Sequence, residues 1–298
     1  SDGGGPIDPG TLQPRFNPAQ SRAFGNSSGS VGAAYPLTRQ LNFAVNGAYT
    51  ERAPTFYELF ANGPHAATGS YEVGNAALGK ERSKAVDAAL KFATGPHTAS
   101  IGVFRNRFDN FITVFNSGNR RGADGELNPV DANGDGVADG SGENISPELR
   151  YRGVPATFQG VELEGKVRIA ERPGLLDLLL RFDEVRAEDR STGRPLPRIA
   201  PRRYGASLQY EASRLGARLD VTRVDGQSRV SAGELPTDGY VMVNATVSHK
   251  VKMEGLDVEA FVRGNNLLNE EARNHVSFLK DIAPLGRRSL LIGLRGRI

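Results

Sequence analysis

The stretch GVELEGKVRI at residues 160–169 alternates between apolar and charged side chains, and this alternation decides the fold. Successive side chains of an extended chain point to opposite faces, so one face here is apolar and the other is charged. The apolar face carries Val161, Leu163, Val167 and Ile169. The opposite face carries Glu162, Glu164, Lys166 and Arg168. Such a pattern predicts a β-strand with water on one side and apolar surroundings on the other.

The same alternation recurs along most of the chain, for example in LNFAVNGAY (41–49) and AVDAALKF (85–92). It predicts ten or eleven antiparallel strands, at residues 28–35, 40–51, 80–94, 97–115, 150–171, 175–188, 200–212, 214–230, 237–251, 255–268 and 286–298. Several of these segments are longer than the roughly 5–6 residues usual for strands in soluble sheets. The chain is therefore expected to be all-β.

The connections between the predicted strands alternate in length. Residues 94–96 and the stretch around Ser213 are tight, whereas the long connections are residues 52–79, 116–149, 189–199 and 269–285. Outer-membrane barrels show this rhythm, because their turns are short on the periplasmic side and their loops are long outside. A soluble sandwich or propeller is the alternative, but sandwiches turn their apolar faces inward and use shorter strands. We therefore expect an antiparallel transmembrane β-barrel.

The composition limits the other classes of protein. Lys and Arg number 37 against 34 Asp and Glu, and the formal charge of +3 is spread without basic runs, so no nucleic-acid partner is expected. The chain has no Cys, which excludes disulfides and thiolate metal sites. No apolar run approaches the ~18–20 residues that a membrane helix needs. The mean hydropathy of −0.40 does not exclude membrane strands, because alternation hides their apolar face from an average.

Three short motifs, GNNLLN at residues 264–269, GRR at 286–288 and TERAPTFYEL at 50–59, resemble elements of the TonB-dependent outer-membrane receptors. GNNLLN at residues 264–269 is similar to the box that ends the penultimate strand of that family, and GRR at 286–288 is similar to the element that opens its last strand. TERAPTFYEL at 50–59 is similar to a third family element. The matching positions are Pro54, Glu58, Leu59, Gly264, Asn266, Leu267, Gly286 and Arg287.

The segment ANGPHAATGSYEVGN at residues 61–75 resembles the zinc-uptake subgroup of these receptors. The resemblance implies energy-coupled uptake of a metal ion, with zinc favoured, or of a metal chelate. A siderophore, heme or another TonB-dependent ligand is the alternative within the family. No reaction is catalysed in this interpretation, so the chain is not expected to be an enzyme, and no cofactor is required.

A complete receptor of this family has an N-terminal plug domain inside a barrel of about 22 strands. The resemblance implies that residues 1–298 form roughly the last 10–11 strands of that barrel, with 1–27 as an extracellular loop segment and 28–298 as barrel strands and loops. The plug domain is expected outside this chain. The implied location is the bacterial outer membrane, and the implied partners are outer-membrane lipid, the remaining half of the barrel, and the TonB–ExbB–ExbD system, reached through the plug.

Zinc binding would need a set of His and carboxylate ligands, usually three or four. His65 and Glu72 lie seven residues apart in the zinc-like segment, and a loop that folds back would bring them together. His275, in the loop between the last two predicted strands, is the expected third ligand. The alternative is that His65 is an exposed loop residue without a ligand.

The stretch DANGDGVADGSGE at residues 131–143 resembles a calcium-binding loop in its spacing. Short oxygen ligands at alternate positions allow one loop to surround a hard cation. The candidates for a structural Ca²⁺ are Asp131, Asn133, Asp135 and Asp139. The Glu expected at the twelfth position is absent, because Gly142 stands there. A solvated turn cluster is the alternative interpretation.

Two classes outside the family compete with this interpretation. A soluble carbohydrate-binding β protein would usually expose Trp or Tyr platforms, and the chain has no Trp. An outer-membrane hydrolase would need a nucleophile beside a His, and no Ser-His-Asp arrangement, phosphate loop or catalytic carboxylate pair stands out in the sequence.

Overall fold

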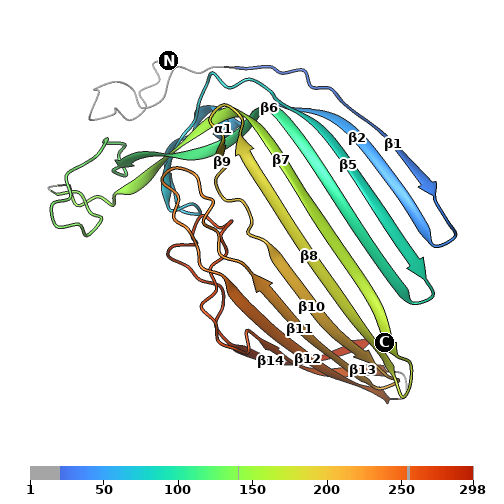
Figure 1. Ribbon diagram of the computed structural model, residues 1–298. Coiled ribbons are helices and arrows are strands. Elements are labelled where there is room, and N and C mark those ends of the chain that lie inside the picture. The colour runs from blue at the N-terminus through green and yellow to red at the C-terminus, as the bar shows by residue number, and fades with distance from the viewer. Residues whose placement is uncertain (1–20, 140, 254–255, 298) are drawn as a thin grey trace.

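Eleven strands follow one another across a single antiparallel sheet in the computed structural model, which describes residues 21–139, 141–253 and 256–297. Figure 1 shows this sheet as a curved wall whose strands follow the order of the chain. Its strands are β1 (Ser28–Pro36), β2 (Leu41–Arg52), β5 (Glu81–Thr94), β6 (His97–Arg121), β7 (Ser146–Ala170), β8 (Leu175–Asp189), β10 (Arg203–Glu211), β11 (Leu215–Val224), β12 (Tyr240–Met253), β13 (Leu256–Asn265) and β14 (Ser289–Arg297). The predicted all-β antiparallel architecture and the strand number are confirmed.

The alternation did not predict four short elements in the long connections. These are α1 (Phe56–Phe60), β3 (Asn62–His65), β4 (Ser70–Val73) and β9 (Arg194–Pro195). Thr55 caps the start of helix α1: its side chain accepts from the Glu58 backbone amide while the Glu58 carboxylate accepts from the Thr55 amide. This reciprocal capping box satisfies two donors that a helix start leaves free. No helix in the described ranges is long and apolar enough to cross a membrane.

The register places the apolar residues of neighbouring strands on one face of the wall. Leu163 of β7 lies opposite Ile101 of β6 and Phe182 of β8, and Phe182 lies opposite Tyr204 of β10. This face stays open, since 41% of Ile101 and 38% of Leu163 are exposed. An uncovered apolar band of this kind is what a lipid-facing barrel wall presents.

The other face of the wall is polar and paired by charge. Lys166 lies 3.3 Å from Asp177, and Arg168 contacts the same carboxylate. Arg218 lies 2.7 Å from Asp220. These contacts join adjacent positions and neighbouring strands on the face that a barrel turns toward its lumen.

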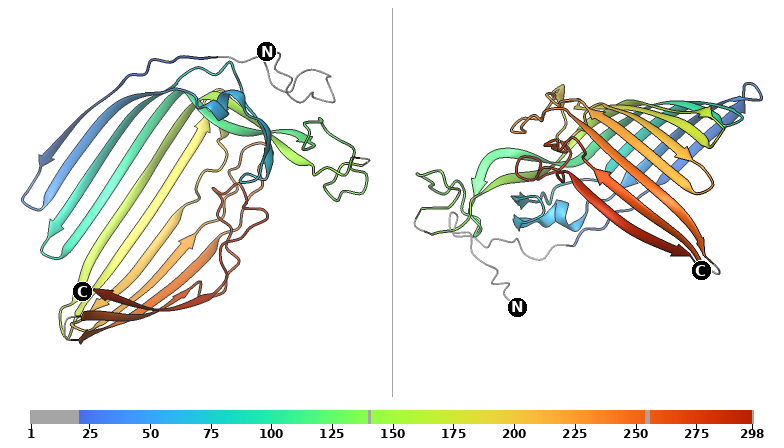
Figure 2. Two further views of the ribbon diagram at one scale, coloured as in Figure 1. Left: turned by 180° about the vertical axis from the view of Figure 1, so that it is seen from behind. Right: turned by 90° about the horizontal axis from the view of Figure 1, so that it is seen from below.

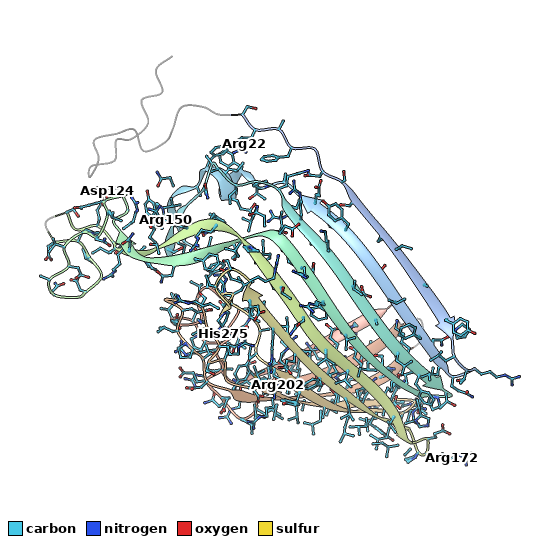
Figure 3. All side chains as sticks on the ribbon, turned by 45° about the horizontal axis from the view of Figure 1, so that its top comes forward. Arg22, Asp124, Arg150, Arg172, Arg202 and His275 are labelled. Atoms are coloured by element: carbon cyan, nitrogen blue, oxygen red, sulfur yellow. The ribbon has the colours of Figure 1, made fainter. Side chains whose placement is uncertain are left out.

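The two ends of the wall differ as the connection lengths predicted. Tight turns at residues 37–40, 95–96, 171–174 and 212–214 lie at one end, and the long connections lie at the other (Figure 1). Figure 2 shows the long connections gathered beside the curved wall from two further directions. In Figure 3, Arg172 marks the turn end and His275 lies among the long connections. Of the predicted loop segment 1–27, residues 1–20 lie outside the described ranges and residues 21–27 form no strand.

The buried core lies at the long-connection end, where a second layer exists. There β6 and β7 continue past their neighbours, each being 25 residues long. Val154 and Ala156 of β7 pack with Ala187 and Leu196, and the rings of four partly buried Phe pack against them. A single-layer wall cannot bury either face within the chain, so dense packing is possible only where loops fold over it.

Candidate ligand site among the long loops

The hairpin of β3 and β4 positions the first predicted ligand pair. Its register sets Gly63 opposite Glu72 and His65 opposite Ser70. Strand β4 also runs parallel to β7, with Tyr71 beside Glu148, which attaches the hairpin to the wall. The residues between the strands turn back so that His65 reaches the carboxylate of Glu72.

Glu72 is the centre of this pair and is only 6% exposed. Its Oε1 accepts from the Thr68 hydroxyl at 2.9 Å and lies 3.1 Å from His65 Nδ1. Its Oε2 accepts from the Tyr151 hydroxyl at 3.0 Å. The His65 side chain remains 52% exposed. The structure therefore joins His65 and Glu72, with the carboxylate fixed from behind and the imidazole facing solvent.

His275 lies in a different cluster and is 1% exposed. Its Nδ1 is 2.9 Å from the Thr237 hydroxyl, and its Nε2 is 3.2 Å from Glu234 Oε1, without hydrogen-bond geometry. The Lys280 ammonium lies 3.3 Å from the same Glu234 oxygen. This cluster connects the loop between β11 and β12 with the loop between β13 and β14.

Glu234 carries the negative charge of the second cluster. Burial by itself raises its pKa, but the contact with His275, hydrogen bonds from the Ser231 and Arg198 amides, and the charge of Lys280 together lower the pKa of Glu234 to about 2. The carboxylate is therefore ionised at neutral pH and compensates the buried Lys280.

The three expected zinc ligands are thus divided between two clusters. In the ranges that the structure describes, no three His, Cys, Asp or Glu side chains form a group that could hold a metal ion. His275 is already surrounded by Thr237, Glu234 and Lys280, which is why it does not join the hairpin pair. Sequence spacing could not reveal this, because these contacts come from separate loops.

A cavity of about 140 Å³ lies between the two clusters. Thr68 and Ser70 line it from the hairpin, and Glu234 and Lys280 line it from the later loops. Arg198 also lines it, with a positive φ of 57° and its guanidinium 4.1 Å from the centre of the Phe278 ring. Burial lowers the pKa of Arg198, and one Nη donates to the Thr113 hydroxyl at 3.2 Å. Sequence reasoning missed Arg198, since nothing marks it in a loop without a motif.

The residues that match the family motifs lie where the strands of the wall meet the long loops. Pro54 is buried just before α1 and Leu59 is buried within it, and Glu58 pairs with Arg52 at 2.8 Å. Asn266 is 1% exposed, has a positive φ of 48°, and donates to the Glu270 and Gly286 carbonyls.

The remaining family-like positions lie around the same joint. A Cβ on Gly264 would lie 2.6 Å from Cδ2 of Leu267, so that side chain would have to shift to make room for it. Beside Gly286, Arg287 pairs with Glu271 at 2.7 Å. These residues shape the loop ends and contact neither cluster described above.

The predicted calcium residues lie at the tip of the β6–β7 extension. Asp135 accepts from the Val137 amide and Asp139 accepts from the Ala132 amide. Asn133 donates to Asp135 at 3.0 Å. Asp131 Oδ2 accepts from the Gly136 amide, whereas its Oδ1 has no hydrogen-bond partner although the side chain is only 6% exposed.

Known proteins resemble this chain in sequence and in fold. Residues 5–267 match the family described as TonB dependent receptor-like, beta-barrel. The copper transporter OprC superposes with a TM-score of 0.70 at 18% identity over 92% of this chain and 40% of its own. The siderophore receptor PirA from Acinetobacter baumannii gives 0.60 at 17% identity, over 90% of this chain and 40% of its own. The FrpB iron transporter from Neisseria meningitidis gives 0.60 at 14% identity, over 90% and 38%.

These structures share the fold at low identity, and the chain spans about 40% of their length. The wall with one apolar face, the tight-turn end and the long-loop end agree with that likeness. The match of the family over most of the chain is the stronger finding. The chain therefore belongs to the TonB-dependent receptor family and forms part of its β-barrel.

Proposed function

We propose that the chain is the C-terminal barrel portion of a receptor that imports a metal ion, with zinc favoured, or a metal chelate. The pairing of His65 with Glu72, 3.1 Å apart on a hairpin at the long-loop end, is the observation that carries this proposal. The similar structures include a copper transporter, an iron transporter and siderophore receptors, which supports a metal-related ligand.

The membrane and the class of protein follow from the family. The chain is located in the outer membrane of Gram-negative bacteria, and the family consists of transporters, not enzymes. The hydrolase and the soluble carbohydrate-binding protein are thereby excluded. Energy from the TonB–ExbB–ExbD system would arrive through a plug domain outside this chain, and the remaining barrel strands would pair with the edges of β1 and β14.

The chemistry of the hairpin pair suits a soft-to-borderline divalent cation. Imidazole nitrogen and carboxylate oxygen are both common zinc ligands. Tyr151 and Thr68 hold the Glu72 carboxylate in place, which is how outer hydrogen bonds orient a metal ligand. A captured ion would keep water or chelate atoms at its other positions, so it could be passed onward.

Zinc affinity of the full-length receptor tests this proposal. His65→Ala combined with Glu72→Gln should weaken zinc binding about 10–100-fold in calorimetric titration. His249→Ala is the matched control, because His249 is exposed near the tight-turn end of the wall. Equal zinc affinity of the double variant and the control would refute the role of the pair. His275→Gln tests the third expected ligand separately. Because His275 lies in the other cluster, this variant should bind zinc as tightly as the parent receptor.

A ferric siderophore or heme is the second candidate ligand. The Arg198 guanidinium favours it, because a cation that is partly shielded from water at the long-loop end attracts an anionic chelate. Uptake of radiolabelled zinc and of a labelled ferric chelate by the same cells distinguishes the two. Loss of zinc uptake alone in the His65 and Glu72 variant supports zinc, and loss of chelate uptake alone supports the second candidate.

We propose in addition that the tip loop 131–139 binds Ca²⁺ as a structural ion. The buried Asp131 Oδ1 without a partner supports this, since a buried carboxylate oxygen costs free energy unless something satisfies it. Calcium at millimolar concentration should raise the melting temperature of the parent receptor and leave that of Asp131→Asn unchanged. Identical melting with and without calcium in the parent would refute the site.

A further inference from the structure

The outward face of the wall changes from apolar to basic toward the long-loop ends of β5 and β6. On β5, Val86 is 58% exposed, and the next outward position is Lys84. On β6, Val103 is 49% exposed, and the next outward positions are Arg105 and Arg107. The face that contacts lipid along most of the wall thus ends in a group of exposed cations.

These cations are adjacent, and no acidic side chain of the described residues pairs with them. Lys84 lies directly opposite Arg107 in the register, and Arg105 lies opposite Val86. Like charges directly opposite one another destabilise a strand pair. Lys84, Arg105 and Arg107 make no ion pair within the described ranges, and Asp109, an acid two positions beyond Arg107, lies 3.9 Å from Arg190.

Other outward cations near this end of the wall have acidic partners. Arg82 is 3.2 Å from Glu51 on β2, and Arg186 is 2.8 Å from Glu184 on β8. Among the outward cations that the structure describes near this end, Lys84, Arg105 and Arg107 are therefore the three without an acidic partner. Gln159 of β7 lies between Arg105 and Arg186 in the same cross-strand row and is also exposed. We call Lys84, Arg105, Arg107 and Gln159 the β5–β6 basic patch.

An apolar hollow of about 710 Å³ lies on the same face, farther from the loops. Leu90 and Phe92 of β5, Ile101 of β6, Leu163 of β7 and Phe182 of β8 line it. Along β6 the outward positions run from Ile101 through Val103 to Arg105 and Arg107, so hollow and patch are continuous. One amphiphilic molecule could occupy both, with chains on the hollow and a charged head on the patch.

We propose that the β5–β6 basic patch binds the phosphate groups of an anionic lipid in the outer leaflet, whose acyl chains lie along the apolar hollow. The Arg fork matches phosphate oxygens in bidentate geometry, and Lys84 adds a compact charge. Basic clusters beside a membrane attract anionic head groups in this way. The lipid head supplies the negative charge that the unpaired Lys84 and Arg107 lack.

Lipid binding by the full-length receptor tests this assignment. The probe is purified bisphosphorylated lipid A, added to receptor in neutral detergent and measured as lipid phosphorus retained after gel filtration. Lys84→Gln/Arg105→Gln/Arg107→Gln should bind it at least tenfold more weakly than the parent. The control Arg39→Gln/Arg172→Gln/Arg214→Gln removes equal charge from exposed positions at the turn end and should bind like the parent.

Two further arms keep the test decisive. The single variant Lys84→Gln changes less and should lower binding severalfold, even if the triple variant fails to fold. Dephosphorylated lipid should bind the parent and the triple variant equally, because the hollow is intact in both. Equal retention of lipid A by the triple variant and the control would overturn the proposal. Full displacement of the lipid by millimolar inorganic phosphate would also overturn it, because the patch would then bind a free ion and not a lipid.

Discussion

The wall and the long-loop end of this molecule are built on different principles. The wall is one layer of strands whose apolar face stays open, so its stability depends on the solvent being lipid. The loop end is folded over the extensions of β6 and β7 and holds buried groups such as Lys280, His275 and Asn266. The contrast shows that periodicity specifies the first region and that particular side-chain contacts specify the second.

A charge introduced on the lipid face should cause the largest loss of stability. Leu163→Arg places a cation in the apolar band and should destabilise the receptor in bilayers by about 2–4 kcal/mol. Ser100→Arg is the matched control, because Ser100 lies on the polar face opposite Glu164. Urea unfolding in lipid vesicles measures both. Equal loss in the two variants would contradict the assignment of the faces.

Acid should weaken the loop cluster around Glu234. The pKa of Glu234 is about 2 in the folded chain, below its ordinary value of 4.5, so its contribution is fully present above pH 4.5 and is lost as pH falls toward 2. The free energy at stake is on the order of 3 kcal/mol at most. Glu234→Gln should lower stability at neutral pH and flatten the dependence between pH 4.5 and 2. The protease sensitivity of residues 266–288, recorded during melting at each pH, measures this dependence. A variant as acid-sensitive as the parent would contradict it.

Substitution of Asn266 should lower the stability of the fold more than substitution of its neighbour Asn265. Asn266→Ala removes donors to the Glu270 and Gly286 carbonyls and leaves these groups unsatisfied, which should cost about 1–3 kcal/mol. Asn265→Ala loses one contact with Ser289 near the surface and should cost less than about 0.5 kcal/mol. Denaturation of the two single variants gives the comparison. A larger loss in Asn265→Ala would show that the joint is held elsewhere.

The smallest effect is expected in the hairpin. Tyr151→Phe removes the hydroxyl that donates to Glu72 and should weaken the attachment of β4 by about 0.5–1.5 kcal/mol. Faster hydrogen exchange at residues 62–73 is the expected readout, with no change along β10. Tyr210→Phe is the control, because Tyr210 lies near the turn end of the wall. Unchanged exchange in Tyr151→Phe would mean that the pairing of β4 with β7 is sufficient.

The strands were predictable because alternation is local to each segment. The stretch 160–169 shows both faces without reference to any neighbour, and its register with Ile101 and Phe182 follows from keeping apolar residues on one side. Helix α1 also had a local signal, since Thr55 and Glu58 have capping-box spacing, but its five residues were too few to show a helical period.

The site was predictable only where its partners are close in sequence. His65 and Glu72 belong to one hairpin, so a loop that folds back was sufficient to join them. His275 meets Thr237 across 38 residues, and Arg198 meets Thr113 across 85. Such contacts depend on how separate loops fold over the wall, and no periodic pattern encodes that. The contacts of His275 with Glu234 and Lys280 could therefore be found only from the structure.

Because β6 and β7 are long, they hold the tip loop well outside the membrane, where it faces the cell's surroundings. Each strand has 25 residues, whereas crossing a bilayer takes about 9–11, so roughly 14 residues of each extend above the membrane. The segment 122–139 lies at the end of this two-stranded extension. Antibodies and other large particles outside the cell would therefore reach it before they reach the wall. An epitope tag inserted there would report surface display on living cells while leaving both the wall and the hairpin pair undisturbed.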